Sequence, residues 1–146
     1  MTAPAYFDRH IQDQKRVTGT EGNFRWCYEQ QVALVESWLR PGTMVMDVGC
    51  GGRLPYGVPL STVMIGLDPS EESLSVNRGI DVPVCAGAQA IPFPDGEVHL
   101  ILALYSLHHC TTQTYAGSRL RAERVIREML AQGRRLEGDH LANLRT

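Results

Sequence analysis

A short apolar run that passes directly into glycines constrains the fold of this chain more than any other feature. Residues 43–48 read Thr-Met-Val-Met-Asp-Val, with Pro-Gly before them and Gly-Cys-Gly-Gly at 49–52 after them. This pattern predicts a buried strand that ends in a tight backbone turn. Because ligands of open α/β sheets bind beyond the carboxyl ends of the strands, residues 49–52 are candidates for a ligand-binding loop.

The rest of the chain alternates between helical and strand-like patterns. Apolar positions on the first predicted helix include Leu34, Val35, Trp38 and Leu39, which we expect to face the core. Near-continuous apolar strands are typical of a parallel sheet that is covered on both faces. The predicted class is therefore α/β, a Rossmann-like, mostly parallel sheet with flanking helices. We predict helices over 24–40, 70–77 and 119–132, and strands over 43–48, 62–67, 82–85 and 98–105.

Length and composition predict one soluble globular domain. The chain has 146 residues, of which 43% are apolar and 21% charged. No run reaches the roughly 18–20 apolar residues of a membrane span, so we expect no membrane contact.

The net charge is −2, and the balance over 111–146 is +3. Arginines and glutamates alternate there at helical spacing, which favours a solvated helix face over nucleic-acid binding.

The cysteines do not form a recognisable metal or disulfide framework. Cys27, Cys50, Cys85 and Cys110 lack Cys-x-x-Cys spacing. The adjacent residues 108–110, His-His-Cys, do not readily point at one metal, so no metal site is predicted. Free thiols fit a cytoplasmic protein.

An acidic residue follows the second predicted strand at a suggestive position. Asp68 lies 21 residues after Asp47, at the carboxyl end of the strand over 62–67. A carboxylate there can accept hydrogen bonds from both hydroxyls of a ribose, so a nucleotide-type ligand is indicated. A dinucleotide oxidoreductase is disfavoured, because Leu54 stands where the last glycine of Gly-x-Gly-x-x-Gly belongs, and Pro55 and Pro59 interrupt the helix that should follow.

Four motifs follow one another along the chain. They are Asp-Val-Gly-Cys-Gly-Gly at 47–52, Gly-Leu-Asp-Pro-Ser at 66–70, the stretch 88–96, and Leu-Tyr-Ser-Leu-His-His at 104–109. In this order they resemble the motifs of class I S-adenosylmethionine-dependent methyltransferases, and most closely those of the small-molecule, ubiquinone/menaquinone-biosynthesis-like branch. The resemblance covers roughly residues 24–130, and it is specific for the fold and less so for the substrate.

The resemblance implies S-adenosylmethionine as the cofactor and assigns a part of it to each motif. The implied cofactor-binding residues are Asp47, Gly49, Cys50 and Gly51 for the methionine part, Asp68 for the ribose, Pro69, Ser70, Ala88 and Gln89 for the adenine, and Leu104 and Tyr105 beneath the sulfonium. His108 and His109 are candidate general bases, although a structural role for them is also open. The implied reaction is in-line methyl transfer to an oxygen, nitrogen or carbon nucleophile of a small molecule.

Departures from the family pattern keep a non-catalytic alternative open. Arg53 and Gly87 stand where family members usually carry a glycine and an acid.

We expect a single, truncated domain over 1–146, with a lead-in at 1–23, a cofactor-binding core at 24–132 and an irregular tail at 133–146. The expected sheet lacks the family's C-terminal strands. Its open edge would favour a homodimer or a partner subunit. The alternative is a methyltransferase-like binding or scaffolding protein that self-associates through that edge.

Overall fold

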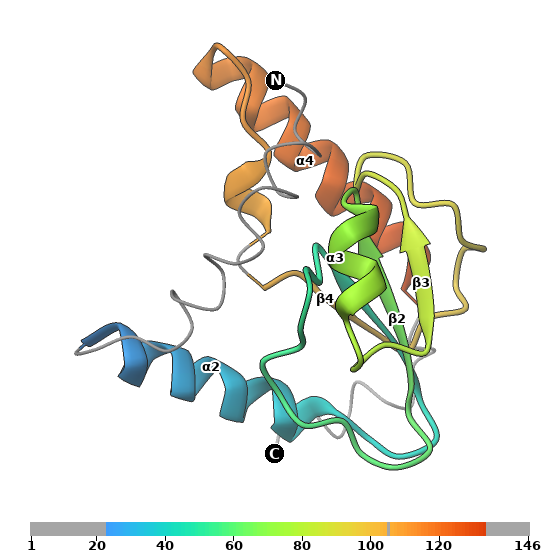
Figure 1. Ribbon diagram of the computed structural model, residues 1–146. Coiled ribbons are helices and arrows are strands. Elements are labelled where there is room, and N and C mark those ends of the chain that lie inside the picture. Colours follow the sequence, from blue (N-terminus) through green and yellow to red (C-terminus); the bar gives the residue numbers. More distant parts are fainter. Residues whose placement is uncertain (1–22, 105, 134–146) are drawn as a thin grey trace, which may run out of the picture.

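Four parallel strands form the centre of the molecule in the order β3-β2-β1-β4 (Figure 1). The computed structural model describes residues 23–104 and 106–133, with side chains from residue 29 onward except that of His108. The strands are β1 (Met44–Val48), β2 (Val63–Asp68), β3 (Val82–Cys85) and β4 (Leu100–Leu102). The predicted Rossmann-like class is confirmed.

Strand order reverses at β1, which places the ligand-binding crevice of the fold. The chain leaves β1 for β2 and β3 on one side and returns to β4 on the other. Met46 pairs with Ile65 of β2 and with Ile101 of β4. In open α/β sheets such a reversal leaves room for a ligand beyond the carboxyl ends of the two strands that flank it, here β1 and the edge strand β4.

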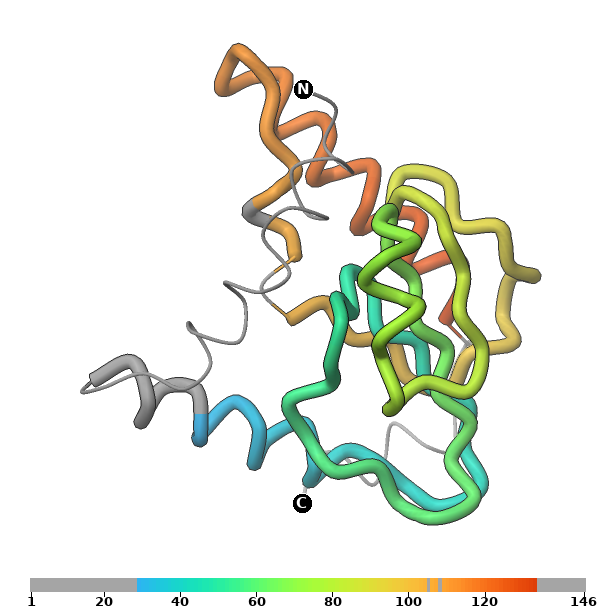
Figure 2. Tube along the Cα trace, in the orientation of Figure 1, coloured from blue at the N-terminus to red at the C-terminus, as the bar shows by residue number. Residues whose placement is uncertain are grey.

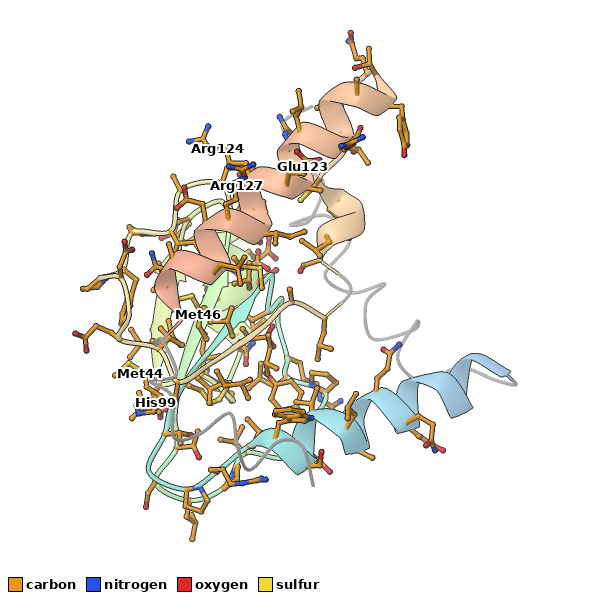
Figure 3. The ribbon with its side chains drawn as sticks, turned by 180° about the vertical axis from the view of Figure 1, so that it is seen from behind. Met44, Met46, His99, Glu123, Arg124 and Arg127 are labelled. Atoms are coloured by element: carbon orange, nitrogen blue, oxygen red, sulfur yellow. The ribbon has the colours of Figure 1, made fainter. Side chains whose placement is uncertain are left out.

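Alternating side chains of the strands build one core on each face of the sheet. Val45 and Met64 face α2 (Asn23–Trp38) and α3 (Glu71–Val76), whereas Met46 and Ile65 face the side covered by α4 (Tyr115–Gln132). Figure 3 shows Met46 beneath α4. All four of these strand side chains are fully buried. This burial on both faces explains why the strands read as apolar throughout.

The segment that follows the glycine loop is an extended loop rather than a helix. Residues 53–61 descend along the molecule to the start of β2 (Figure 2). Two of their side chains, Leu54 and Tyr56, are nevertheless buried in the core shared with α2 and α3. The N–H of Gly57 donates to the Glu36 carboxylate of α2 at 2.7 Å, which ties the loop to that helix. Proline at 55 and 59 accounts for the absence of helix, as predicted.

The helices differ from the sequence-based expectation in their exposed faces and in one boundary. Leu34 and Trp38, predicted to face the core, are exposed, because only Val35 and Leu39 at the end of this segment are buried against the sheet.

The last helix begins at Tyr115 instead of residue 119. The Thr114 hydroxyl caps it by accepting from the N–H of Gly117 at 3.1 Å. Such a cap extends the helix by one turn into residues that read as a loop.

The fourth strand is shorter than predicted, and its amino end is occupied by a histidine. β4 covers residues 100–102, not 98–105, because the chain then leaves the sheet toward a one-turn 3₁₀ helix, η1 (Leu107–His109), that the sequence did not predict. His99 exchanges hydrogen bonds with Met44: its N–H donates to the Met44 carbonyl at 2.9 Å, and its Nδ1 accepts from the Met44 N–H at 3.2 Å (Figure 3). The side chain of His99 thus continues the pairing of β4 with β1.

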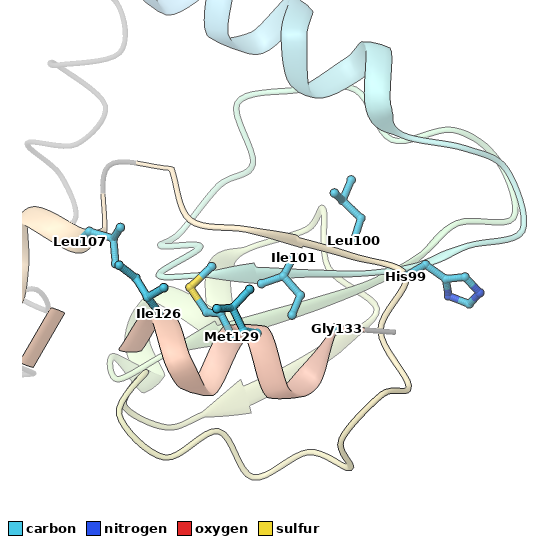
Figure 4. Close-up of a pocket in the computed structure, with 8 residues that line it drawn as sticks. His99, Leu100, Ile101, Leu107, Ile126, Met129 and Gly133 are labelled. Carbon is cyan, nitrogen blue, oxygen red and sulfur yellow. The ribbon is translucent and has the colours of Figure 1, made fainter. Parts of the chain in front are cut away.

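An apolar groove of about 380 Å³ runs between β4 and α4 (Figure 4). It lies along the outer edge of the sheet, where Val98 forms a single parallel bridge with Gly133. The groove is lined by His99, Leu100, Ile101, Leu107, Ile126, Met129, Leu130 and Gly133.

None of the helices in the described part of the chain is long and apolar enough to cross a membrane. The predictions for the lead-in (1–23) and the tail (133–146) lie almost entirely outside the described residues.

Candidate functional site

The residues singled out by the motifs meet at one edge of the sheet. β1, β2 and β3 end at Val48, Asp68 and Cys85, and the segment after β4 runs past the same edge. Because parallel strands end together, residues 47–51, 68–70, 86–89, 103–104 and 106 are brought to the carboxyl ends of the strands. The structure therefore brings together four segments that are separate in the sequence.

Gly49 turns the chain sharply at the end of β1. Its φ of +78° lies in the left-handed region that favours glycine. Its N–H donates to the Leu67 carbonyl of β2 at 2.7 Å. A β-carbon on Gly49 would lie 2.5 Å from Cβ of Ser106, which follows β4. Gly49 is thus required both by the backbone conformation and by the close approach of the segment after β4.

The next part of the loop is held between an acid and an amide. The N–H of Gly51 donates to Oδ2 of Asp68 at 2.9 Å, and the Gly51 carbonyl accepts from Nδ2 of Asn77 at 2.9 Å. Oδ1 of Asp68 accepts from the N–H of Ser70 at 2.8 Å. Asp68 and Asn77 are both buried. These contacts fix the glycine loop against the end of β2 before any ligand arrives.

A buried carboxylate with one unpartnered oxygen lies beside this loop. Asp47 is 2% exposed, and its Oδ2 accepts from the Tyr56 hydroxyl at 2.6 Å. Its Oδ1 is buried and has no hydrogen-bond partner within the described part of the chain. Burial raises the pKa of Asp47 to about 6; the Tyr56 hydrogen bond opposes this increase, and the negative charge of Asp68 adds to it. An unpaired buried acceptor of this kind is matched by a cationic N–H donor of a ligand.

The raised pKa of Asp47 predicts that its charge weakens the ligand-free fold at neutral pH. An acid whose pKa is higher in the folded state stabilises the fold only where it is protonated. Stability therefore falls as the pH rises from about 4 to about 6. Asp47→Asn should raise the free energy of unfolding at pH 7.5 by up to about 3 kcal/mol, with no gain near pH 4.

Urea unfolding at the two pH values measures this difference. Asp81→Asn provides the control, because Asp81 is an exposed carboxylate that accepts a strand N–H, that of Met64, at 2.8 Å. A gain for Asp47→Asn that persists at pH 4 would contradict the electrostatic explanation.

Cys50 fills space in the site and is not a nucleophile. Burial raises the pKa of its thiol, so the thiol stays protonated. Its Sγ would lie 2.8 Å from a β-carbon on Gly66, so the glycine at 66 leaves the space that the Cys50 side chain fills. Cys50, Cys85 and Cys110 are free cysteines.

The residues implied for the adenine line the outer part of the same edge. Ser70 is fully buried and caps α3, its hydroxyl accepting from the N–H of Ser73 at 3.1 Å. Ala88 packs on the core face shared with α4, and the Gln89 carbonyl accepts from Nε of Arg124 in α4 at 3.0 Å. Pro69 is half-buried beside Ser70. The contacts described for these residues are all made within the protein.

The candidate bases and the residues implied beneath the sulfonium are only partly described. His109 is exposed at the end of η1. Tyr105 and the side chain of His108 lie outside the described residues. Leu104 is half-buried and packs against the core on the α2 face. In the segments the structure describes, no group of three or more His, Cys, Asp or Glu side chains is arranged to hold a metal ion.

Two residues of the site lie outside every sequence motif. Tyr56 and Asn77 reach it from the loop after the glycines and from the end of α3. Their contacts follow no spacing rule, so the sequence does not reveal them. Ser106 lies within the motif at 104–109 but was given no role, and its buried Oγ has no partner among the described residues. The only available signal was an aromatic residue, Tyr56, inside the proline-containing loop at 53–61.

Comparison with known proteins decides the family. A model of the family described as "Methyltransferase domain" matches residues 46–132, which include the end of β1, the carboxyl ends of the other strands and α4. The chain belongs to the methyltransferase domain family. The class I fold that the motifs implied is confirmed, and S-adenosylmethionine is the cofactor of that family.

Individual relatives of this methyltransferase domain are longer proteins. "Probable tRNA methyltransferase 9B" of Mus musculus is 30% identical over 99 residues, which are 66% of this chain and 21% of the mouse protein. "tRNA (carboxymethyluridine(34)-5-O)-methyltransferase alkbh8" of Xenopus tropicalis is 32% identical over 77 residues, 51% of this chain and 12% of the other. The chain thus spans about a fifth or less of the curated relatives that it matches.

A solved structure shares the fold at low sequence identity. Magnesium protoporphyrin IX methyltransferase (ChlM) from Synechocystis PCC 6803, solved with bound S-adenosylmethionine, superposes with a TM-score of 0.66 at 20% identity. The match covers 89% of this chain and 69% of that one. At this identity the similarity supports the Rossmann-like arrangement alone.

Proposed function

We propose that this methyltransferase domain binds S-adenosylmethionine at the carboxyl edge of its sheet and transfers the methyl group to a small molecule. The observation that carries the proposal is the buried Oδ1 of Asp47 beside the glycine loop, which has no partner among the described residues. An α-ammonium group satisfies this acceptor and neutralises a charge that burial otherwise penalises. The rigid loop at 49–51 and the acid at 68 provide the remaining contacts expected for a methionine and a ribose.

In the proposed complex each part of the edge has a separate task. Gly49, Cys50 and Gly51 lie against the methionine part, and Asp68 accepts from the ribose hydroxyls while it still holds the loop. Pro69, Ser70, Ala88 and Gln89 border the adenine, and Leu104 and Tyr105 border the sulfonium. Bound S-adenosylmethionine supplies a methyl group on a sulfonium that leaves as a neutral thioether.

The chain's own contribution to the reaction is alignment and proton removal. The acceptor's lone pair forms the new bond to the methyl carbon as the carbon–sulfur bond breaks, and the sulfur keeps that electron pair. Holding the acceptor in line with this bond provides most of the rate gain. His108 and His109 are the proposed bases for the acceptor's proton, because an imidazole titrates near neutral pH. We place this activity in the cytoplasm, in keeping with the free thiols.

The acceptor is proposed to be a small molecule of the kind used by the ubiquinone/menaquinone-biosynthesis-like branch. A second candidate acceptor is tRNA, since both curated relatives are named as tRNA methyltransferases. α4 also exposes Arg119, Arg121, Arg124 and Arg127, of which Figure 3 labels the last two. Arg119 is paired with Glu123 at 2.7 Å. The alternative function is a non-catalytic binding or scaffolding role, with a homodimer or a partner at the edge of β4.

Incubation with S-adenosylmethionine labelled in its methyl group separates these candidates. We expect label in the small-molecule fraction of a cell extract and none in total tRNA. Label in tRNA alone would replace the first acceptor class by the second. If the chain bound the cofactor and labelled neither fraction, the non-catalytic role would be favoured.

A further inference from the structure

Tyr56 occupies a position that the fold fixes from both sides. Leu54 packs beside Gly79, where a β-carbon would lie 3.0 Å from the leucine side chain, and the N–H of Gly57 is bonded to Glu36 of α2. Between these two anchors Tyr56 is 6% exposed, although Leu60 of the same loop is 90% exposed. The loop without helix therefore delivers one aromatic side chain inward.

The Tyr56 hydroxyl is directed at a single atom of the site. It donates to Oδ2 of Asp47 at 2.6 Å, a short hydrogen bond between two buried groups. Burial and the neighbouring Asp47 carboxylate raise the pKa of Tyr56, so the phenol stays protonated and remains a donor. A carboxylate gripped at one oxygen cannot rotate freely, and its second oxygen keeps a defined direction.

The groups that face Asp47 explain why the hydrogen bond from Tyr56 is important. The titratable groups that act on its pKa are the Tyr56 phenol and the Asp68 carboxylate, and the protonated Cys50 thiol lies nearby. None of these groups is a cation. Asp47 is thus held ionised chiefly by one hydrogen bond, and that bond leaves Oδ1 for an incoming ligand.

We propose that Tyr56 is a positioning residue that aims Oδ1 of Asp47 at the ammonium group of the cofactor. This inference rests on the proposed function, because it assumes that an ammonium group binds there. It adds a residue that neither the motifs nor the family match assigns. Tyr56 itself touches Asp47 and not the reacting atoms.

Two titrations of the full chain and its Tyr56→Phe variant test the proposal. The first follows the Asp47 carboxyl carbon by ¹³C NMR without ligand, and the second measures the dissociation constant of S-adenosylhomocysteine from pH 5.5 to 7.5. Without the phenol bond the pKa of Asp47 should rise. The variant should therefore bind about threefold or more weakly near pH 6, with the difference narrowing toward pH 7.5. Tyr115→Phe removes a hydroxyl from an exposed tyrosine and should change neither titration.

A second substitution protects the test against loss of folding. Placing 3-fluorotyrosine at position 56 keeps the ring and makes the phenol a stronger donor. The midpoint of the Asp47 carboxyl titration and the midpoint of the pH dependence of the dissociation constant should then both move to lower pH. Unchanged Asp47 titration in both variants would overturn the positioning role. If the wild-type chain bound no S-adenosylhomocysteine at any pH, the proposed function would fail and the positioning role with it. Shifted titration with shifted binding supports both.

Discussion

Gly49→Ala should destabilise the chain by about 2–5 kcal/mol and remove measurable cofactor binding. The φ of +78° imposes a left-handed backbone that costs an alanine about 1–2 kcal/mol. The added β-carbon would also lie 2.5 Å from Cβ of Ser106, and such overpacking costs about 1–3 kcal/mol more. Ser106 cannot yield easily, because the contact is at its β-carbon and not at the end of a flexible chain.

Two further substitutions separate the contributions of strain and contact. Gly42 has a nearly equal φ of +75°, and a β-carbon added there would meet nothing within 4 Å, so Gly42→Ala should lose only the conformational part. Adding Ser106→Gly to Gly49→Ala should restore the part due to contact. Urea unfolding measures each loss, and calorimetry measures binding. Equal losses for Gly42→Ala and Gly49→Ala would contradict the close approach of the two segments.

Asp68→Ala should weaken S-adenosylmethionine binding about a hundredfold or more. Asp68 is 7% exposed and accepts the N–H groups of Gly51 and Ser70 at 2.9 and 2.8 Å. Its loss would leave two amides unpaired at about 1–3 kcal/mol each and release the glycine loop. The proposed ribose contacts, hydrogen bonds to a charged group worth about 1.5–3 kcal/mol each, would be lost as well.

Asp81→Ala is the matched control for this substitution. Asp81 also accepts the N–H of a β2 residue, Met64, at 2.8 Å, but near the start of that strand and away from the carboxyl edge. Its replacement should lower stability while leaving the dissociation constant unchanged. Similar losses of affinity in the two variants would mean that Asp68 acts only through the stability of the fold.

The sequence was sufficient to predict that the main motif residues meet at one end of the sheet, because each motif is local. The glycines after β1 and the acid at the end of β2 are each read from a strand followed by a turn, and parallel pairing then brings them together. A wider apolar face was predicted for the first helix than the fold buries: Leu34 and Trp38 are exposed, although both fit helical periodicity. Periodicity shows which side of a helix is apolar, but not how much of it finds a partner.

Contacts between distant segments could not be predicted. Tyr56 and Asn77 act on Asp47 and Gly51 across 9 and 26 residues, from a proline loop and a helix end that carry no pattern for such contacts. The start of α4 at Tyr115 likewise depends on a cap by Thr114 within a polar run. In each case one side-chain hydrogen bond fixes the local structure, and such bonds produce no periodic pattern in the sequence.

Calorimetric titration of the full chain with S-adenosylmethionine at pH 7.5 tests the central claim most directly. We predict binding with one site per chain, and loss of that binding in Asp68→Ala at a temperature where circular dichroism shows the variant to be folded. NADH, titrated in parallel, should give no heat of binding. A folded wild-type chain that bound no S-adenosylmethionine at millimolar concentration, or that bound NADH instead, would contradict the proposed cofactor site.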